Sequence, residues 1–241
     1  MSDKMHLLLL SSSRTAGTPF LEHARDFLHG FLAGRARRVL FIPYAAVSLS
    51  HEQMTARVAE VFASLGCECI GIHTQPDPVK AVESAEAVAV SGGNTFRLLQ
   101  LLQQQRLLAP LRARVRGGLP YVGWSAGSNV ACPSIRTSND MPIAWPADPE
   151  ALGLVPFQIN PHYTDVVPAG HQGETRDERL TEFMKLNPAM PVVGLREGSA
   201  LRLSGGQLEL LGGLPARLFH GGRVRDLAPG ESLQSLLETP R

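Results

Sequence analysis

The segment Gly123–Gly127 is the most informative part of the chain for chemistry, and it reads Gly-Trp-Ser-Ala-Gly. It fits the pattern G-x-S-x-G, in which a serine lies on a sharp turn between a strand and a helix. An apolar run precedes the segment, and a stretch of small residues, Ala126–Ala131, follows it. The backbone N–H of Ala126 could then face a developing oxyanion. The segment predicts that Ser125 is a nucleophile; the alternative is a glycine-rich turn with an incidental serine.

A serine nucleophile needs a base, normally a histidine, and an acid that orients the base. Of the eight histidines, His162 is favoured because it follows the apolar run 157–159 and because Pro161 restricts its loop. Open α/β sheets bind their ligands in loops beyond the carboxyl ends of the strands. His171, within a Gly-His-Gln-Gly segment, is the competing candidate.

The candidate acid is Glu197, which lies just beyond the apolar strand Pro191–Leu195 and precedes a glycine. A solvated turn residue is the alternative interpretation of this side chain. The resulting order of Ser125, His162 and Glu197 differs from the order of serine, acid and histidine in α/β-hydrolases. The turn around the serine is therefore hydrolase-like, but the order of the three residues is not that of an α/β-hydrolase.

A second glycine-rich segment, Ser91–Phe96, follows another expected strand and contains Gly92 and Gly93. Glycines let backbone N–H groups approach a ligand closely, so the segment is a candidate for a second oxyanion donor. A helix-capping turn with Asn94 as the cap is the alternative. Because these glycines, the serine and the candidate acid all follow strands, we expect them at one edge of the sheet.

The first half of the chain alternates strand-like and helix-like segments, which indicates a mostly parallel sheet flanked by helices. After a long loop, Thr137–Leu154, shorter runs separated by glycine turns predict antiparallel C-terminal hairpins. We expect one α/β domain over residues 1–241, with the parallel sheet extended by the antiparallel strands. Thr18 and Pro19 predict the start of the first helix. The expected strands are 5–11, 39–43, 68–72, 87–90, 119–123, 192–195, 200–203 and 208–211, and the expected helices are 21–32, 51–65, 78–84, 96–104, 108–116 and 180–186.

The charge balance argues against two classes of protein. The chain of 241 residues has 23 Lys and Arg and 22 Asp and Glu, a formal net charge of +1. Generic nucleic-acid binders and polybasic membrane-surface proteins usually carry a marked positive excess. The apolar run Leu7–Leu10 is too short for a signal peptide or a membrane span, so we expect a cytoplasmic protein. The three cysteines have no metal-site spacing, so free buried thiols and no metal site are expected.

Several segments together resemble the peptidase E family of α-aspartyl dipeptidases. The resemblance runs over nearly the whole chain, and its motifs together are highly specific. Two small departures are a Ser-Gly-Gly segment in place of three glycines and Ser128 in place of the usual alanine. The segments that carry it are 7–11 (LLLLS), 123–129 (GWSAGSN), 135–142 (IRTSNDMP), 158–163 (QINPHY), 170–176 (GHQGETR) and 194–198 (GLREG).

The resemblance implies a serine peptidase on a fold related to class I glutamine amidotransferases. It places the nucleophile at Ser125, the base at His162 and the acid at Glu197. It assigns the oxyanion donors to the backbone N–H groups of Gly93 and Ala126. The implied reaction is hydrolysis of dipeptides with N-terminal aspartate, without a cofactor. We expect a monomer or a homodimer without a metal.

The resemblance also implies that Arg176 contacts the substrate. Thr175 and Glu178 fit a capping box, so Arg176 would lie in the first turn of a helix. A cation is unfavourable at that end of a helix dipole. Either the arginine is solvated and offset by its acidic neighbours Glu174, Asp177 and Glu178, or positive charge is concentrated here to bind an anion such as an aspartyl side chain.

Two other functions fit parts of the sequence. A hydrolase of the cyanophycinase type shares the serine turn and cleaves β-aspartyl–arginine links, but it would need acidic residues for the arginine side chains of its substrate. An amidotransferase-like binding protein with an idle serine is the alternative from another class.

Overall fold

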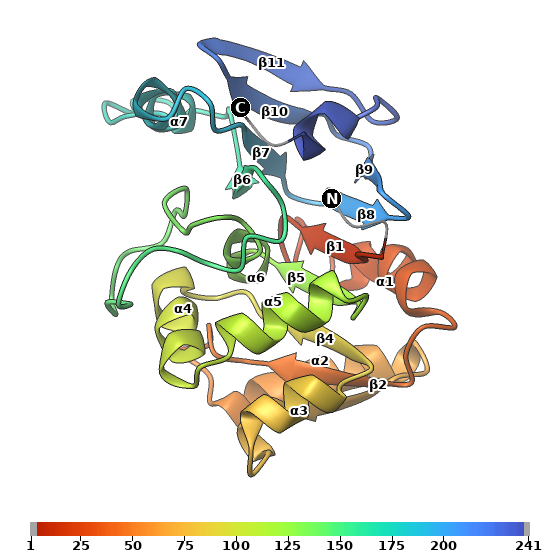
Figure 1. Cartoon of the computed structure of the whole chain (residues 1–241). Coiled ribbons are helices and arrows are strands. Elements are labelled where there is room, and N and C mark those ends of the chain that lie inside the picture. The colour runs from red at the N-terminus through yellow and green to blue at the C-terminus, as the bar shows by residue number, and fades with distance from the viewer. Residues whose placement is uncertain (1–3, 239–241) are drawn as a thin grey trace.

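The computed structural model describes residues 4–238, which form two β-sheets (Figure 1). The seven-stranded sheet has the order β3-β2-β4-β5-β1-β8-β9, and the four-stranded sheet has the order β11-β10-β7-β6. Strands β3 to β1 of the first sheet run parallel, whereas β8 and β9 are antiparallel. The expected α/β class, with a mostly parallel sheet flanked by helices, is confirmed.

In the first half of the chain the elements follow the alternation that the sequence predicts, and β6, β10 and β11 are additional to the strands for which the sequence predicts bounds. The strands are β1 (Leu7–Leu10), β2 (Arg38–Ile42), β3 (Glu68–Gly71), β4 (Ala87–Val90), β5 (Tyr121–Trp124), β6 (Gln158–Tyr163), β7 (Val192–Arg196), β8 (Ala200–Ser204), β9 (Gln207–Leu211), β10 (Ala216–His220) and β11 (Arg223–Leu227). The helices are α1 (Arg25–Leu32), α2 (His51–Ser64), α3 (Pro78–Ser84), α4 (Thr95–Gln104), α5 (Leu108–Arg116), α6 (Ala126–Val130) and α7 (Arg176–Leu186), with short 3₁₀ helices η1 (Glu22–Ala24), η2 (Ile72–Thr74) and η3 (Gln234–Leu237).

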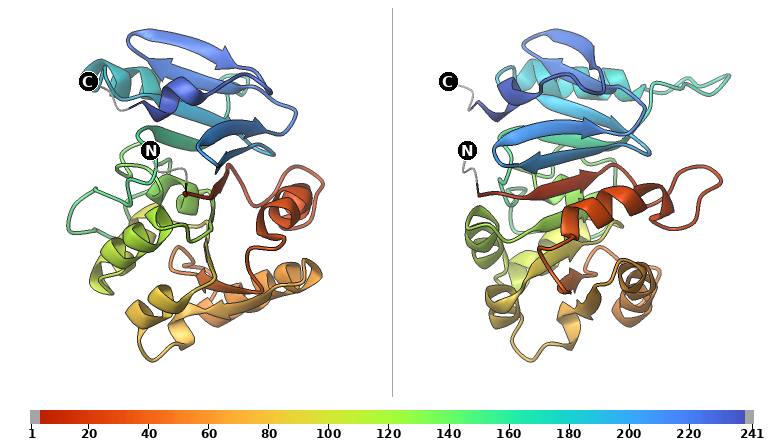
Figure 2. Two further views of the ribbon diagram at one scale, coloured as in Figure 1. Left: turned by 45° about the vertical axis from the view of Figure 1, so that its right-hand side comes forward. Right: turned by 90° about the vertical axis from the view of Figure 1, so that its right-hand side faces the viewer.

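The seven-stranded sheet is covered on both faces, because successive side chains of a strand point to opposite faces. In β1, Leu7 and Leu9 pack into the core under α3, α4 and α5. Leu8 and Leu10 pack into the opposite core under α1 and α2. Figure 2 shows the two groups of helices on either side of the sheet. A run of four leucines is therefore what a strand buried on both faces needs.

Side-chain caps account for most helix starts. The Ser50 side chain accepts from Gln53 N in a capping box at α2, and Thr175 and Glu178 form the same motif at α7. The helix start predicted at Thr18 is wrong, because the Thr18 hydroxyl instead binds the carbonyl of Thr15. Regular structure there begins only with η1, after a residue in the left-handed region.

The C-terminal strands do not all extend the parallel sheet, which corrects the expected arrangement. β8 pairs antiparallel with β1 and continues the first sheet. β7 instead pairs parallel with β6 and antiparallel with β10 in the second sheet. The chain leaves the second sheet after Arg196 and joins the first at Ala200, so Glu197 lies in the turn between the two sheets.

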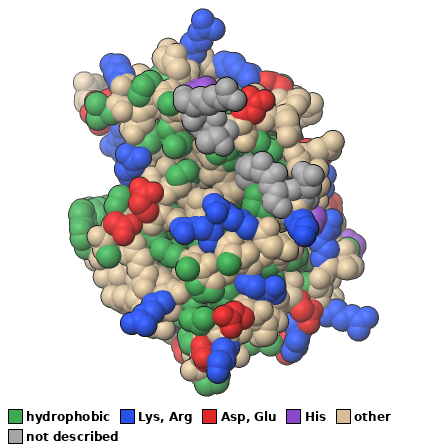
Figure 3. Space-filling model, in the orientation of Figure 1, with side chains coloured by type: hydrophobic (Ala, Val, Ile, Leu, Met, Phe, Trp, Pro, Cys, Tyr) green, Lys and Arg blue, Asp and Glu red, His purple; other side chains and the backbone are tan. Residues whose placement is uncertain are grey.

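Two long segments outside the sheets complete the molecule. The loop 131–157 runs over α4 and α6, and the loop between β6 and α7 projects from the body of the molecule (Figure 2). Cationic and anionic side chains are interspersed over the face in Figure 3, in keeping with the small net charge. Within residues 4–238, no helix is both long and apolar enough to cross a membrane.

The turn between β5 and α6 packs so tightly that only glycine fits at both of its glycine positions. A Cβ on Gly123 would lie 2.6 Å from the carbonyl carbon of Gly127, and a Cβ on Gly127 would lie 2.2 Å from the carbonyl oxygen of Val90. Both clashes are with backbone, which cannot move aside as a flexible side chain would. The two glycines of the G-x-S-x-G pattern are therefore explained by close approach of the chain to itself.

We expect Gly127→Ala to lower the free energy of unfolding by about 1–3 kcal/mol or more, because overpacking against backbone forces the strand and helix apart. Gly30→Ala is the matched control: Gly30 lies on the exposed side of helix α1, and no atom lies near its added Cβ. There the change should stabilise by up to about 1 kcal/mol. Urea unfolding followed by circular dichroism measures both, and equal effects would contradict the packing argument.

Candidate active site

Ser125 has the strained backbone of a nucleophile turn. Its φ and ψ are 52° and −112°, in a region that non-glycine residues rarely occupy. Its N–H donates to Leu10 O at 3.1 Å, and its carbonyl accepts from the N–H groups of Ser128 and Asn129. These bonds hold the residue at the carboxyl end of β5 and the start of α6, with its hydroxyl free to meet another side chain.

His162 lies inside strand β6 and not in a loop beyond it, which corrects the expected location. Its φ is 53°, and the pairing of β6 with β7 shifts register between Pro161 and Tyr163. This bulge leaves His162 without a ladder partner and redirects its side chain. The Nε2 atom lies 2.9 Å from Ser125 Oγ, and Nδ1 lies 2.6 Å from Glu197 Oε1.

The hydrogen bonds define the protonation of the imidazole. An ionised carboxylate can only accept, so Nδ1 carries the proton that is donated to Glu197. Nε2 of the neutral ring is then the acceptor for the Ser125 hydroxyl. The structure thus brings together Ser125, His162 and Glu197, although they come from different sheets. Such a chain can take a proton from the serine as it attacks and stabilise the resulting imidazolium.

Two backbone N–H groups lie free beside the serine turn. Neither Gly93 nor Ala126 donates its N–H to any acceptor among residues 4–238. Ala126 directly follows the serine. An added Cβ at Gly92 would lie 3.0 Å from Ser125 Cβ, so the glycine segment packs against the turn. Gly93 has a φ of 136° and is pressed against the backbone of Ala45, where only glycine fits. The geometry permits both groups to act as oxyanion donors.

Two other candidate side chains lie apart from this chain of hydrogen bonds. The His171 ring interacts with the carbonyl of Glu174 at 3.4 Å and not with the serine. Asp140, which lies in a segment with no predicted role, accepts from the N–H and hydroxyl of Thr95 at 2.7 Å and 2.5 Å. Its carboxylate therefore caps α4, just after the glycine segment, and Glu197 is the carboxylate that binds the imidazole.

Arg176 lies in the first turn of α7 and lines a cavity of about 400 Å³ under the projecting loop. The hydroxyl of Tyr163, the residue after His162, donates to Asp177 at 2.5 Å and so attaches this helix start to β6. In the described part of the chain, the Arg176 guanidinium forms no hydrogen bond or ion pair. Burial, and then the neighbouring Arg179, lower its pKa from the ordinary value.

The acidic neighbours that could offset Arg176 are all engaged elsewhere. Glu174 pairs with Arg179 at 3.5 Å. Asp177 binds Tyr163 and lies 3.4 Å from Arg217. Glu178 completes the capping box with Thr175, and these hydrogen bonds lower its pKa. Among residues 4–238 the arginine is therefore a half-buried cation without a counter-ion, an arrangement that suits an anion-binding site.

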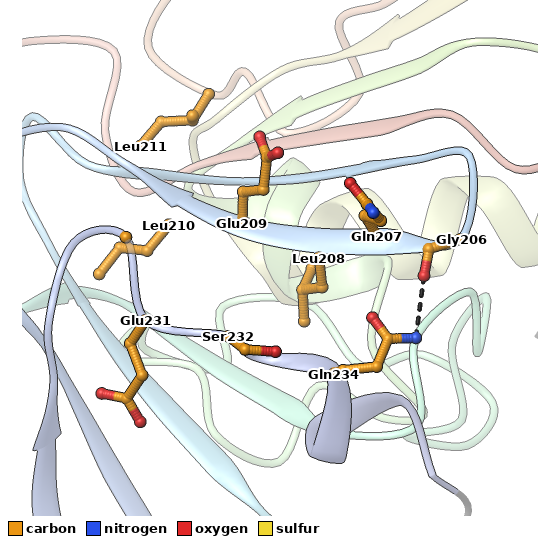
Figure 4. Close-up of a pocket in the computed structure, with 10 residues that line it drawn as sticks. Gly206, Gln207, Leu208, Glu209, Leu210, Leu211, Glu231, Ser232 and Gln234 are labelled. Atoms are coloured by element: carbon orange, nitrogen blue, oxygen red, sulfur yellow. Dashed lines mark hydrogen bonds between the residues drawn. The ribbon is translucent and has the colours of Figure 1, made fainter.

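A second cavity, of about 670 Å³, lies between β9 and the segment before η3 (Figure 4). Its lining includes Glu209, Glu231 and Gln234, and the Gln234 amide donates to Gly206 O at 3.0 Å. None of the predicted site residues lines it. It contains no nucleophile paired with a base, so its residues do not suggest a reaction.

The sequence does not predict the polar residues that form hydrogen bonds to the backbone around His162. The Ser11 hydroxyl accepts from the N–H of His162 at 2.9 Å. Asn139 donates to Pro161 O at 2.7 Å, and Asn160 donates to Asn139 at 2.6 Å. Ser11 and Asn139 lie in segments that carry the family resemblance, but spacing alone does not show which polar side chains meet in space.

All three cysteines are free thiols, as predicted, but only Cys67 and Cys132 are fully buried, whereas Cys69 is partly exposed. Burial raises the pKa of Cys69 and of Cys132 to about 12 and also raises the pKa of Cys67. Across residues 4–238, no group of three or more His, Cys, Asp or Glu side chains could hold a metal ion. Among these candidate nucleophiles, Ser125 is the one that has a base, His162, within hydrogen-bond distance.

Comparisons with known proteins give a consistent result. Residues 7–211 match the family model described as Peptidase family S51. A peptidase E from Shewanella denitrificans is 47% identical over 234 residues, covering 97% of this chain and 99% of that protein. A peptidase E from Streptomyces coelicolor is 51% identical over 236 residues, covering 97% of this chain and 96% of that protein.

Solved structures agree on the fold. A peptidase from an acI-B1 actinobacterium superposes with a TM-score of 0.68 at 19% identity, covering 96% of this chain and 98% of that one. A putative peptidase E from Listeria monocytogenes superposes with a TM-score of 0.67 at 21% identity, covering 86% of this chain and 98% of that one.

We expect thiol reagents to leave the activity of the native protein intact. With a pKa of about 12 for Cys69 and Cys132, the reactive thiolate is on the order of one part in 10⁴ at pH 8. Reaction with iodoacetamide should therefore be slow, and all three thiols should react with Ellman's reagent only after unfolding. Rapid labelling of the folded protein together with loss of activity would point to a cysteine nucleophile instead.

Proposed function

This chain belongs to peptidase family S51, and from that membership we propose that it hydrolyses dipeptides with N-terminal aspartate, with Ser125 as the nucleophile. It is a serine-type peptidase of this family. The observation that carries the proposed catalytic roles is the continuous chain of hydrogen bonds from Ser125 through His162 to Glu197, at 2.9 Å and 2.6 Å. Small peptides are its substrates, and the preference for aspartate and the residue roles are the proposal.

In the first half of the reaction, Ser125 Oγ attacks the peptide carbonyl carbon and His162 Nε2 takes the hydroxyl proton. The carbonyl oxygen becomes an oxyanion, which the N–H groups of Gly93 and Ala126 stabilise. Such donors typically contribute about 2.7–4 kcal/mol each to lowering the barrier. The imidazolium then gives its proton to the departing amine, the C–N bond breaks, and an acyl-enzyme remains on Ser125.

In the second half, a water molecule attacks the ester carbonyl of the acyl-enzyme while His162 takes one of its protons. The C–O bond to Ser125 breaks, and the proton returns to the serine oxygen. The aspartate product leaves as a free carboxylate. Glu197 keeps the imidazole in the required tautomer in both halves and stabilises the imidazolium without becoming protonated. Every proton is thus moved by the chain's own residues, which agrees with a reaction that needs no cofactor.

The substrate preference is argued from Arg176. Its fork of N–H donors can hold a carboxylate by two parallel hydrogen bonds, and helix N–H groups can add to them. An aspartyl side chain supplies such a carboxylate, whereas asparagine has nearly the same shape and no charge. The resemblance to the peptidase E family of α-aspartyl dipeptidases implies the same preference.

The two alternative functions are less well supported. A substrate with arginine side chains would require free carboxylates, but Asp165, Glu174 and Asp177 around the cavity are bound to Arg196, Arg179 and Arg217. A binding protein with an idle serine would not need an imidazole aligned between the hydroxyl and a carboxylate.

We expect Ser125→Ala to abolish turnover and to leave the fold intact, because no covalent intermediate can form. The loss of a triad member typically costs on the order of 10⁴–10⁶ in kcat. His162→Ala should cost at least as much as Glu197→Gln, and the activity of the unaltered enzyme should fall on acidification, because a protonated imidazole cannot accept the serine proton. Hydrolysis of Asp-Leu measures each variant.

His171→Ala is the control for these variants, because its ring lies away from the serine. Near-normal activity is expected. Turnover that survives Ser125→Ala, or that is lost more severely in His171→Ala than in His162→Ala, would contradict the assignment.

We expect Arg176→Ala to reduce kcat/KM on Asp-X and to narrow the gap between Asp-X and Asn-X. A charge-assisted pair in a partly dry pocket is worth about 1.5–3 kcal/mol, or about ten- to two-hundred-fold. Arg179→Ala, which removes a neighbouring cation already paired with Glu174, is the control and should keep most of the discrimination. An Asp-to-Asn ratio that does not change in Arg176→Ala would remove Arg176 from substrate recognition.

A further inference from the structure

We infer that Ser11 is a positioning residue for the general base, an inference that rests on the proposed roles of Ser125 and His162. Ser11 directly follows β1 and is fully buried. Its hydroxyl accepts from His162 N–H at 2.9 Å and donates to Leu195 O at 2.6 Å. Its own N–H donates to Ser199 O at 3.0 Å. Through its side chain Ser11 is therefore bonded to the strand of the base and to the near side of the turn that carries Glu197, and through its backbone N–H to the far side of that turn.

The bulge in β6 explains why His162 needs this partner. Residues Asn160, Pro161 and Tyr163 each pair with a residue of β7, but His162 does not. Its N–H is turned out of the ladder by a φ of 53°. A buried N–H without an acceptor is costly, and the bulge conformation would then be disfavoured. Ser11 supplies the acceptor and so stabilises the backbone conformation that aims the imidazole at Ser125.

Packing does not hold the imidazole in place by itself. The His162 side chain is 40% exposed and the Glu197 side chain is 51% exposed, so neither is enclosed by a core. Their orientation depends on the two hydrogen bonds between the side chains and on the backbone below them. A displacement of about 1 Å in a reacting group can cost on the order of 10² in rate. A backbone anchor at this position therefore has a direct effect on proton transfer.

The Ser11 hydroxyl both donates and accepts a hydrogen bond, so a side chain that replaces it must do both. A serine hydroxyl has one proton to donate and lone pairs to accept with. Here the proton goes to β7, two residues before Glu197, and a lone pair receives the N–H of His162. The preceding residue, Leu10, accepts from Ser125 N–H. Two adjacent residues at the end of β1, Leu10 and Ser11, thus bind the backbones of the nucleophile and of the base.

Ser12 provides a matched control within the same segment. It is only 1% exposed, yet among the described residues its hydroxyl has no hydrogen-bond partner. Ser11→Ala and Ser12→Ala remove the same atom from neighbouring buried positions. They differ in whether that atom is bonded to the strands of the site.

The experiment compares Ser11→Ala, Ser12→Ala and Ser11→Thr by steady-state kinetics on Asp-Leu and Asn-Leu. We expect Ser11→Ala to lower kcat by about 10- to 100-fold, with KM and the Asp-to-Asn ratio little changed because Arg176 is untouched. Phosphonylation of Ser125 by a small organophosphonate, which does not use Arg176, should slow to a similar degree. Ser12→Ala should behave as the unaltered protein, and Ser11→Thr should recover part of kcat because it keeps the hydroxyl.

Thermal unfolding shows whether each variant is folded at the assay temperature. A folded Ser11→Ala with the kcat and phosphonylation rate of Ser12→Ala would overturn the inference. If Ser11→Ala does not fold, Ser11→Cys is compared instead, since a thiol is a weak donor and acceptor; normal kcat in that variant would also overturn it. Activity that survives Ser125→Ala would defeat the proposed function itself, whatever the Ser11 variants do.

Discussion

The carboxyl end of β1 is bonded to the backbone at or beside all three residues of the proposed triad. Leu10 accepts from the backbone of Ser125, and Ser11 holds the backbone of His162 and a carbonyl of β7. β1 can do this because of its place in the sheet: it pairs with β5, which leads into the serine turn, and with β8, which leads away from the turn of Glu197. Buried backbone groups must find partners. The hydrogen bonds therefore fix the positions of the ends of β5, β6 and β7 relative to the end of β1.

Backbone strain is present at two of the residues whose side chains meet. Ser125 and His162 both have a positive φ, and such conformations cost on the order of 1–3 kcal/mol each. These conformations persist because hydrogen bonds and packing contacts of the surrounding structure stabilise them. Gly123 and Gly127 let the serine turn approach β4, and the bulge in β6 is held by Ser11. The strain allows the serine hydroxyl and the imidazole to reach each other from different sheets.

Whether Arg176 is neutralised depends on which side chains pair in the folded protein, and not on the number of charged residues nearby in the sequence. Acidic residues beside Arg176 in the chain would suggest that this cation is neutralised, and a count of charges supports that view. In the folded chain Asp177 faces Tyr163 and Arg217, and Glu174 faces Arg179. Consecutive residues on a helix do not face one another, so proximity in sequence is a poor guide here. The result is a half-buried guanidinium that has no counter-ion within the described part of the chain.

The sequence alone determined the features that depend on neighbouring residues. The apolar run Leu7–Leu10, the capping box of Thr175 and Glu178 and the serine turn were predicted because each is set by side chains a few positions apart. The three residues of the proposed triad were also named from the sequence, but their arrangement was not. A one-residue bulge puts His162 inside a strand, and the chain changes sheets at Glu197. Only the tertiary structure decided these points and the role of Ser11, because a hydrogen bond between residues 151 positions apart leaves no periodic signal in the sequence.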